Sequence, residues 1–186
     1  MSVTRFTAPL YTADIGRVEK NRPIRVIIRD FEYGIDSEND EDRVYVPIGY
    51  CSDGTSVPTL LRGIFPVWGK YAQAAIVHDL LYATNSLTRK EADEIFRDAI
   101  LVLGRDIESD KPTLGGRLLA QLAYWAVRLF GNKPFLAGPA EYTLLAARAK
   151  ARADAKDPDL APKILLSLNE LRKEDIMRGS RGELGI

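Results

Sequence analysis

The residues best suited to chemistry lie between Tyr71 and Tyr82. This apolar, helix-forming stretch contains the only histidine of the chain, His78, followed directly by Asp79. His78 and Tyr82 are four residues apart, so they share one face of the helix. Alanines and Tyr71 continue that face and would remove part of the water around the imidazole. Chemistry centred on His78 and Asp79 is therefore one interpretation of this stretch.

The same two residues also have a structural interpretation. A histidine and an aspartate on an apolar helix are commonly core residues whose hydrogen bonds are satisfied within the protein. An isolated carboxylate such as that of Asp79 needs a cation or a hydrogen-bond donor in apolar surroundings. The stretch by itself leaves both interpretations open.

Two further candidates, Asp53 and Ser56, lie in the segment Cys51–Pro58. Asp-Gly marks a tight turn there, and Ser-Val-Pro predicts a short helix near Thr59–Ile64. Polar residues at a strand-to-helix junction are often functional. Ser56 could act as a nucleophile paired with His78, but the segment lacks the Gly-x-Ser-x-Gly pattern. Turn formation is the other interpretation of these residues.

A second helix follows the histidine stretch after a short connection. Thr88 and Glu91 fit a capping box, and apolar residues then recur at helical spacing. The short connection predicts an antiparallel helical hairpin, in which Asp93 could face back toward His78. An ion pair between Asp93 and Arg97, one turn later, is the alternative.

The composition excludes several classes of site. The chain has 186 residues, enough for one core or for one domain with an appendage. Its 26 Lys and Arg equal its 26 Asp and Glu, so no net charge indicates nucleic-acid binding. A single cysteine and a single histidine exclude an internal disulfide framework and zinc sites with several histidines. A bound metal would be a hard cation with oxygen ligands, such as calcium.

Targeting signals are not recognisable in the sequence. The first residues lack the apolar core and cleavage site of a signal peptide. The longest apolar candidate, Leu118–Phe130, is interrupted by Gln121 and Arg128 and is too short for a membrane span. We therefore expect a soluble protein without a transmembrane segment, made in a cytoplasm.

The N-terminal third is predicted to be a small antiparallel sheet or hairpin. Residues 22–33 and 43–50 are rich in β-branched and aromatic residues and are predicted to pair with each other. The acidic segment 36–42 between them resembles a calcium loop only in part, because the Gly and terminal Glu of an EF-hand are missing. We interpret it as a solvated turn.

The C-terminal half is predicted to be helical. A third helix over Gly115–Phe130 completes a three-helix core, and further helices are predicted over Ala140–Lys156 and Lys163–Arg178. The apolar side of the helix over Gly115–Phe130 consists of Leu118, Leu119, Leu122, Trp125, Ala126 and Leu129. We predict an α+β core domain over residues 1–131, then a helical arm and flexible tail over residues 132–186. The arm buries little by itself, so it is expected to lie on a partner or across the body.

Four segments together resemble an uncharacterised phage and prophage protein family. They are Val46–Pro58, Trp68–Ala72, Ala75–Tyr82 and Ala92–Phe96. The family pattern has Asp-Gly-Ala-Ser-Ile-Pro, then His-Asp-x-Leu-Tyr, then Ala-Asp-x-x-Phe. The resemblance covers about residues 22 to 131 and implies a bacteriophage origin and a small α+β domain.

A narrower resemblance concerns the His-Asp-x-x-Tyr motif followed by Ala-Asp on an antiparallel helix. This arrangement is similar to the core of secreted and parvoviral phospholipases A2. The resemblance implies that His78 is a general base activating water and that Asp93 orients its imidazole. It also implies that Tyr82 hydrogen-bonds Asp93 and that Asp79 binds a calcium ion that stabilises the oxyanion.

The chain departs from those phospholipases before the histidine helix. Their glycine-rich calcium loop is absent, and Asp53 is the residue that would replace it. The disulfides of the secreted enzymes are absent as well. We therefore expect a virion component of the tail or baseplate that hydrolyses a lipid or envelope ester and meets other virion proteins through its arm. The alternative is a structural tail protein in which His78 belongs to a core hydrogen-bonded pair.

Overall fold

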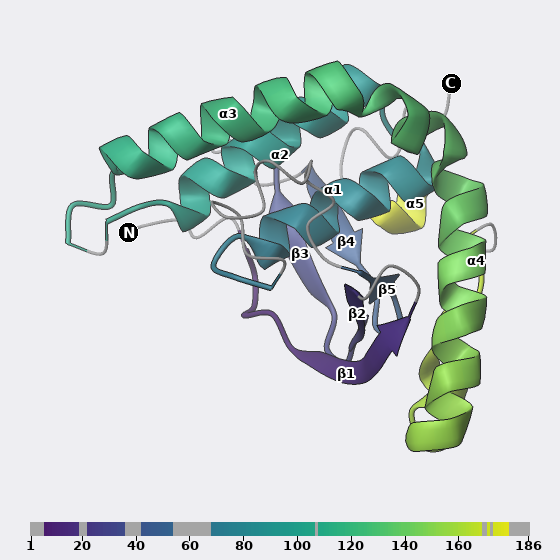
Figure 1. Cartoon of the computed structure of the whole chain (residues 1–186). Coiled ribbons are helices and arrows are strands. Elements are labelled where there is room, and N and C mark those ends of the chain that lie inside the picture. Colours follow the sequence, from purple (N-terminus) through teal and green to yellow (C-terminus); the bar gives the residue numbers. More distant parts are fainter. Residues whose placement is uncertain are drawn as a thin grey trace.

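Helices and strands form separate layers in this protein. The computed structural model describes residues 6–18, 22–35, 42–53, 68–106, 108–168, 171 and 173–178. Figure 1 shows three helices, α1, α2 and α3, gathered on one side of the strands, with the long helix α4 running down one edge. Antiparallel strands packed beside helices make an α+β fold, which confirms the predicted class.

Six strands form two antiparallel sheets of three strands each among the described residues. The first sheet has the order β1-β2-β5, and the second has the order β3-β4-β6. Their bounds are β1 Thr12–Val18, β2 Arg22–Ile27, β3 Phe31–Gly34, β4 Arg43–Val46, β5 Cys51–Ser52 and β6 Met177–Arg178. The inner faces of both sheets contribute aliphatic and aromatic side chains to a single core.

The predicted strand pairing is half confirmed. β3 pairs with β4, with Phe31 opposite Val46, as expected within the predicted hairpin. β2 pairs instead with β1 and β5, because the chain bends at the exposed residues 28–30 and sends its two halves into different sheets. The sequence did not predict β1. The predicted helix over 59–64 and most of the acidic turn lie outside the described residues.

The central helical hairpin is as predicted. α1 spans Ala72–Thr84 and α2 spans Arg89–Leu103, and both sides of the predicted capping box are present at Thr88 and Glu91. Asn85 ends α1 in the left-handed conformation that a tight reversal requires. α1 is buried on nearly all sides because α2, α4 and the strands surround it.

α3, which spans Leu114–Phe130, packs on α2 with a different face from the predicted one. Its buried residues are small ones: Gly116, Ala120, Ala123 and Ala126. The predicted apolar side is largely exposed, including Leu118, Leu122, Trp125 and Leu129. Small side chains face α2 because they allow the two helices to pack closely. At Gly116 the approach is so close that an added Cβ would lie 2.8 Å from the carbonyl oxygen of Gly104.

α4 spans Asn132–Lys156 and begins directly after Gly131, earlier than the predicted start at Ala140, with Pro139 inside it. It lies against α1, β1 and β5, and its buried Tyr142 stacks on Tyr50 with ring centroids 5.1 Å apart. The described part of the predicted arm therefore contacts the body of the protein. The division into domains at residue 131 stays a prediction.

The helix predicted over residues 163–178 is wrong over most of its length. A 3-10 turn, η3, spans Ala161–Lys163, α5 spans Lys173–Ile176, and β6 then pairs with β4. The backbone N–H of Leu165 donates to the carbonyl oxygen of Gly49 at 2.9 Å, so the chain at this point is held against the body. Across the described residues, no helix has the length and apolar character needed to cross a bilayer.

Candidate functional site

The hairpin of α1 and α2 brings His78 and Asp93 together. The Nε2 atom of His78 lies 2.9 Å from the Oδ1 atom of Asp93, although the two residues are 15 positions apart. The predicted alternative for Asp93 is wrong: Arg97 contacts Asp98 instead, with 2.9 Å between Nε and Oδ1. The capping box that starts α2 fixes which of its residues face α1, so local sequence positions this pair.

Two more side chains complete the contacts of Asp93. The hydroxyl of Tyr82 donates to Oδ1 at 2.6 Å, and a guanidinium nitrogen of Arg128 donates to Oδ2 at 2.9 Å. Asp93 is 0% exposed. Burial alone would raise the pKa of this carboxyl, but the hydrogen bonds from His78, Tyr82 and Arg128 outweigh it and hold the pKa below its ordinary value. Asp93 is therefore an ionised carboxylate inside the protein.

Aromatic rings enclose the imidazole of His78. The ring of Phe96 stacks on it at a centroid distance of 4.7 Å, and the ring of Tyr82 lies 4.1 Å away. His78 is only 6% exposed. A cavity of about 210 Å³ lies elsewhere, at the C-terminal end of α1, and His78 does not line it.

The protonation of this group follows from the charge of Asp93. Because the carboxylate is ionised, Nε2 of His78 donates a proton to it, and a neutral imidazole then carries its lone pair on Nδ1. The phenol of Tyr82 stays protonated, since burial and the contact with Asp93 raise its pKa. The arrangement can hold an imidazole in one tautomer and one orientation.

Arg128 is a site residue that sequence reasoning missed. It lies on α3, 35 residues from Asp93, and no local spacing links the two. Arg89 at the start of α2 supports it, donating to the carbonyl oxygens of Val127 at 3.4 Å and Arg128 at 3.0 Å. The only signal in the sequence is that this arginine interrupts an otherwise apolar helix.

Asp79 lies on another side of α1 and contacts the first sheet. The hydroxyl of Ser52 donates to its Oδ2 at 3.0 Å. The pKa of the buried Tyr50 phenol is raised, first by burial and then by the negative charge of Asp79. Asp53 raises the same pKa more weakly. Asp53 is half-buried at the end of β5. The two predicted metal ligands thus border one region, whereas Ser56 lies outside the described residues.

The oxygen atoms around Asp79 are of the type that binds a hard cation, but they are few. Two carboxylates and the hydroxyl of Ser52 are oxygen ligands of the type that calcium takes. Within the described part of the chain, no group of three or more His, Cys, Asp and Glu side chains is placed to hold a metal. Calcium normally has six to eight ligands, so further oxygen atoms would have to complete the site.

Comparisons with known proteins add one relationship. No curated protein and no solved structure matches the chain. Residues 26–110 match a family described as Protein of unknown function (DUF1353). The matched segment contains Asp53, His78, Asp79, Tyr82 and Asp93 and ends before Arg128. Over these residues the chain is similar to an uncharacterised protein family.

Proposed function

We propose that this protein is a hydrolase of carboxylic esters in lipids, acting as a tail or baseplate component of a bacteriophage virion. The observation that carries the proposal is the 2.9 Å contact between His78 Nε2 and Asp93 Oδ1, with the Tyr82 hydroxyl on the same oxygen. This is the base, orienting carboxylate and supporting tyrosine that the phospholipase A2 resemblance implies. The protein would be made in the host cytoplasm and then carried in the virion.

In the proposed reaction Nδ1 of His78 accepts a proton from the water that attacks the ester carbonyl carbon. The imidazolium then returns this proton to the alcohol oxygen as the acyl C–O bond breaks. Asp93 fixes the tautomer and stabilises the imidazolium that forms, because its carboxylate is already charged. Tyr82 and Arg128 hold the carboxylate in place. Asp79 and Asp53 would hold a calcium ion, which would supply stabilisation of the oxyanion.

A second candidate function rests on the burial of the same group. His78 is 6% exposed, and both oxygen atoms of Asp93, on α2, have partners, which lie on α1 and α3. A sealed, satisfied group of this kind can simply join α1, α2 and α3. In that case the protein is a non-catalytic tail or baseplate protein that binds other virion proteins.

The experiment that separates the two candidates measures fatty-acid release from mixed phospholipid vesicles, with calcium and with a chelator. We expect release that requires calcium in the wild type and is lost in His78→Ala and Asp79→Ala. Asp98→Asn is the matched control, because Asp98 lies on α2 but pairs outward with Arg97. A folded wild type without activity, in which His78→Ala lowers only the melting temperature, would favour the structural candidate.

Calcium binding has its own readout, independent of turnover. If Asp79 holds the ion, calcium should raise the melting temperature of the wild type and not that of Asp79→Asn. An equal effect of calcium on both proteins would remove Asp79 from the metal site.

A further inference from the structure

α3 carries a continuous apolar stripe on the side that faces solvent. Its members recur at intervals of four, four, three and four residues, the spacing of one helix face. We call this the α3 stripe; it consists of Leu114, Leu118, Leu122, Trp125 and Leu129. The exposed fractions run from 49% at Leu122 to 74% at Leu114. Contiguous apolar surface of this kind marks a docking site more often than scattered single residues do.

The stripe is not a displaced core face, because the opposite side of α3 already packs. Gly116, Ala120, Ala123 and Ala126 are buried against the neighbouring helix α2. In Figure 1, α3 lies along the outer margin of the molecule with α2 between it and α1. The helix is thus apolar on two sides, and only one of them is covered by the described residues.

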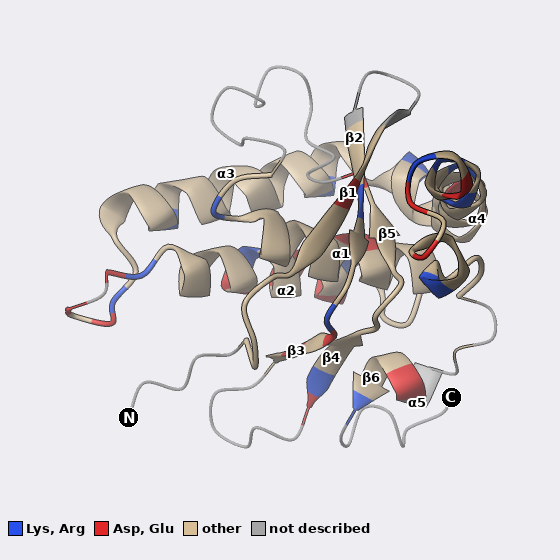
Figure 2. Ribbon diagram, turned by 90° about the horizontal axis from the view of Figure 1, so that it is seen from below, with Lys and Arg blue, Asp and Glu red and all other residues tan. Residues whose placement is uncertain are grey.

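The charged residues on α3 and in the segments next to it in sequence have one sign. Between Asp110 and Glu141 the sequence has no acidic residue but contains Lys111, Arg117, Arg128 and Lys133. In Figure 2 no red segment is visible along α3. Arg117 and Arg128 are about three helical turns apart, so they lie on the same flank of α3.

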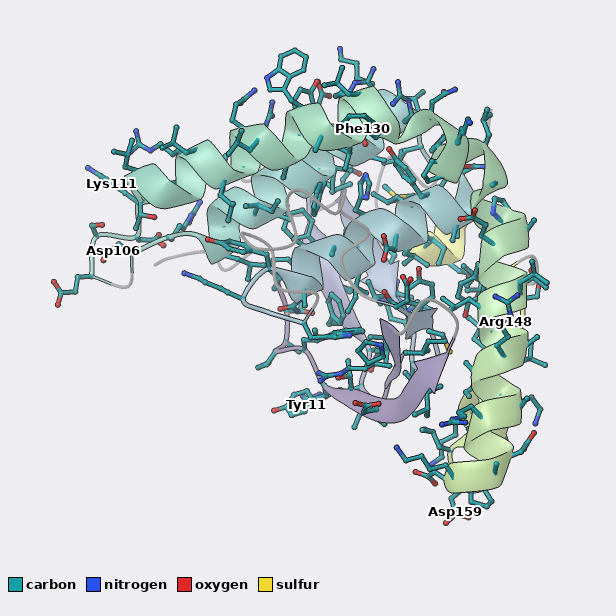
Figure 3. The ribbon with its side chains drawn as sticks, viewed as in Figure 1. Tyr11, Asp106, Lys111, Phe130, Arg148 and Asp159 are labelled. Atoms are coloured by element: carbon teal, nitrogen blue, oxygen red, sulfur yellow. The ribbon has the colours of Figure 1, made fainter. Side chains whose placement is uncertain are left out.

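The cations also bracket the stripe along its length. Figure 3 labels Lys111 just before the start of α3 and Phe130 at its end, where Lys133 follows in the sequence. Lys111, Arg117 and Lys133 are exposed, whereas Arg128 is partly withdrawn by its contact with Asp93. An apolar line of leucines and a tryptophan is therefore edged by at least three accessible cations.

We propose that α3 docks on the surface of an anionic phospholipid bilayer. Leucine and tryptophan side chains enter the boundary between headgroups and acyl chains, while lysines and arginines at the edges meet lipid phosphates. Each basic residue near an anionic bilayer adds attraction, and residues 111–140 contain no carboxylate that would add repulsion.

A second copy of the chain fits the stripe less well. A two-fold antiparallel pairing of α3 helices would bring the Arg117 and Arg128 flank of one copy against the same flank of the other. Arg128 is already paired with Asp93, but no carboxylate within residues 111–140 could neutralise Arg117. Lipid phosphates do so directly.

This inference deepens the proposed function by naming the surface through which a lipid hydrolase would reach its substrate. The docking itself depends on the α3 stripe and not on catalysis, so binding and turnover can fail separately. His78→Ala should therefore bind vesicles as the wild type does. If His78→Ala binds normally but no protein releases fatty acid, the proposed function fails while the docking stands.

The test is flotation of the full chain with vesicles of phosphatidylcholine alone or mixed with an equal part of phosphatidylglycerol. We expect binding to the mixed vesicles and a loss of about tenfold or more in the double variant Leu118→Gln with Leu122→Gln. Arg117→Gln with Lys133→Gln should weaken binding by a similar factor, and added salt should weaken wild-type binding. Leu144→Gln on α4 is the control, because Leu144 is 57% exposed but lies outside the stripe.

Two results would overturn the proposal. One is equal vesicle binding by the wild type and the Leu118→Gln, Leu122→Gln variant. The other is a wild type that binds neither kind of vesicle and is dimeric by light scattering, while the Leu118→Gln, Leu122→Gln variant is monomeric in the same measurement. The second result would make the stripe a contact between copies.

Discussion

On its inner side α3 brings Arg128 to the buried carboxylate of Asp93, whereas its outer side presents Leu122 and Trp125 to solvent. The inner side thus has a buried ion pair beside its small apolar residues, whereas the outer side exposes large apolar side chains, which is unusual for a surface that faces solvent. The inner charges are stable because each has a partner at hydrogen-bond distance. The outer leucines have no comparable compensation within the described residues, which is why we assign them to an interface.

The largest effect is expected at the inner side. Asp93→Asn removes the charge that His78 and Arg128 contact, and it should lower the free energy of unfolding by about 3–5 kcal/mol. Urea denaturation measures the change. Asp98→Asn removes a partly exposed ion pair on the same helix and should cost about 0–1 kcal/mol. Equal effects of the two substitutions would show that the Asp93 contacts contribute no special stability.

Substitutions at two adjacent glycines, Gly115 and Gly116, allow the two sides of α3 to be compared directly. A Cβ on Gly116 would lie 2.8 Å from the carbonyl oxygen of Gly104, whereas a Cβ on Gly115 meets nothing within 4 Å. Gly116→Ala should therefore destabilise the protein by about 1–3 kcal/mol. Gly115→Ala should stabilise it by about 0.4–1 kcal/mol, because alanine has less freedom to lose on folding. Thermal unfolding checks both, and equal signs would contradict the packing of α3.

The pH dependence sharpens the same comparison. The folded pKa of Asp93 is lower than its unfolded value, so its stabilising contribution is fully present above the ordinary pKa of about 4. That contribution is lost as the pH falls from there through the lower folded value. The difference in unfolding free energy between wild type and Asp93→Asn should shrink below about pH 4. A difference that stays constant down to pH 2 would contradict an ionised Asp93.

The smallest effect on stability is expected at the outer side. Leu122→Gln replaces a half-exposed side chain and should change the free energy of unfolding by no more than about 0.5 kcal/mol. Chemical denaturation measures this change, with Ala123→Gln, directed at the buried face, as the contrasting variant. A large loss of stability in Leu122→Gln would mean that the α3 stripe is covered within the protein itself.

Features set by residues close in sequence were predictable. Thr88 and Glu91 satisfy the first N–H groups of α2, and this local hydrogen bonding fixed the start of the helix. The spacing of His78 and Tyr82 placed them on one face, and the short connection turned Asp93 toward them. Each of these rests on backbone geometry over a few residues, which the sequence encodes directly.

The α+β class and the helical hairpin could be predicted from the sequence, which left Asp93 open to a contact with either His78 or Arg97. Three features depend on contacts between segments that are distant in sequence. Arg128 completes the Asp93 contacts, residues 164–168 are not helical, and α3 buries its alanines instead of most of its leucines. The physical reason is that an apolar helix has no intrinsic preference between two apolar faces. Close approach of α2 through small residues selects one face, and that choice also carries Arg128 inward.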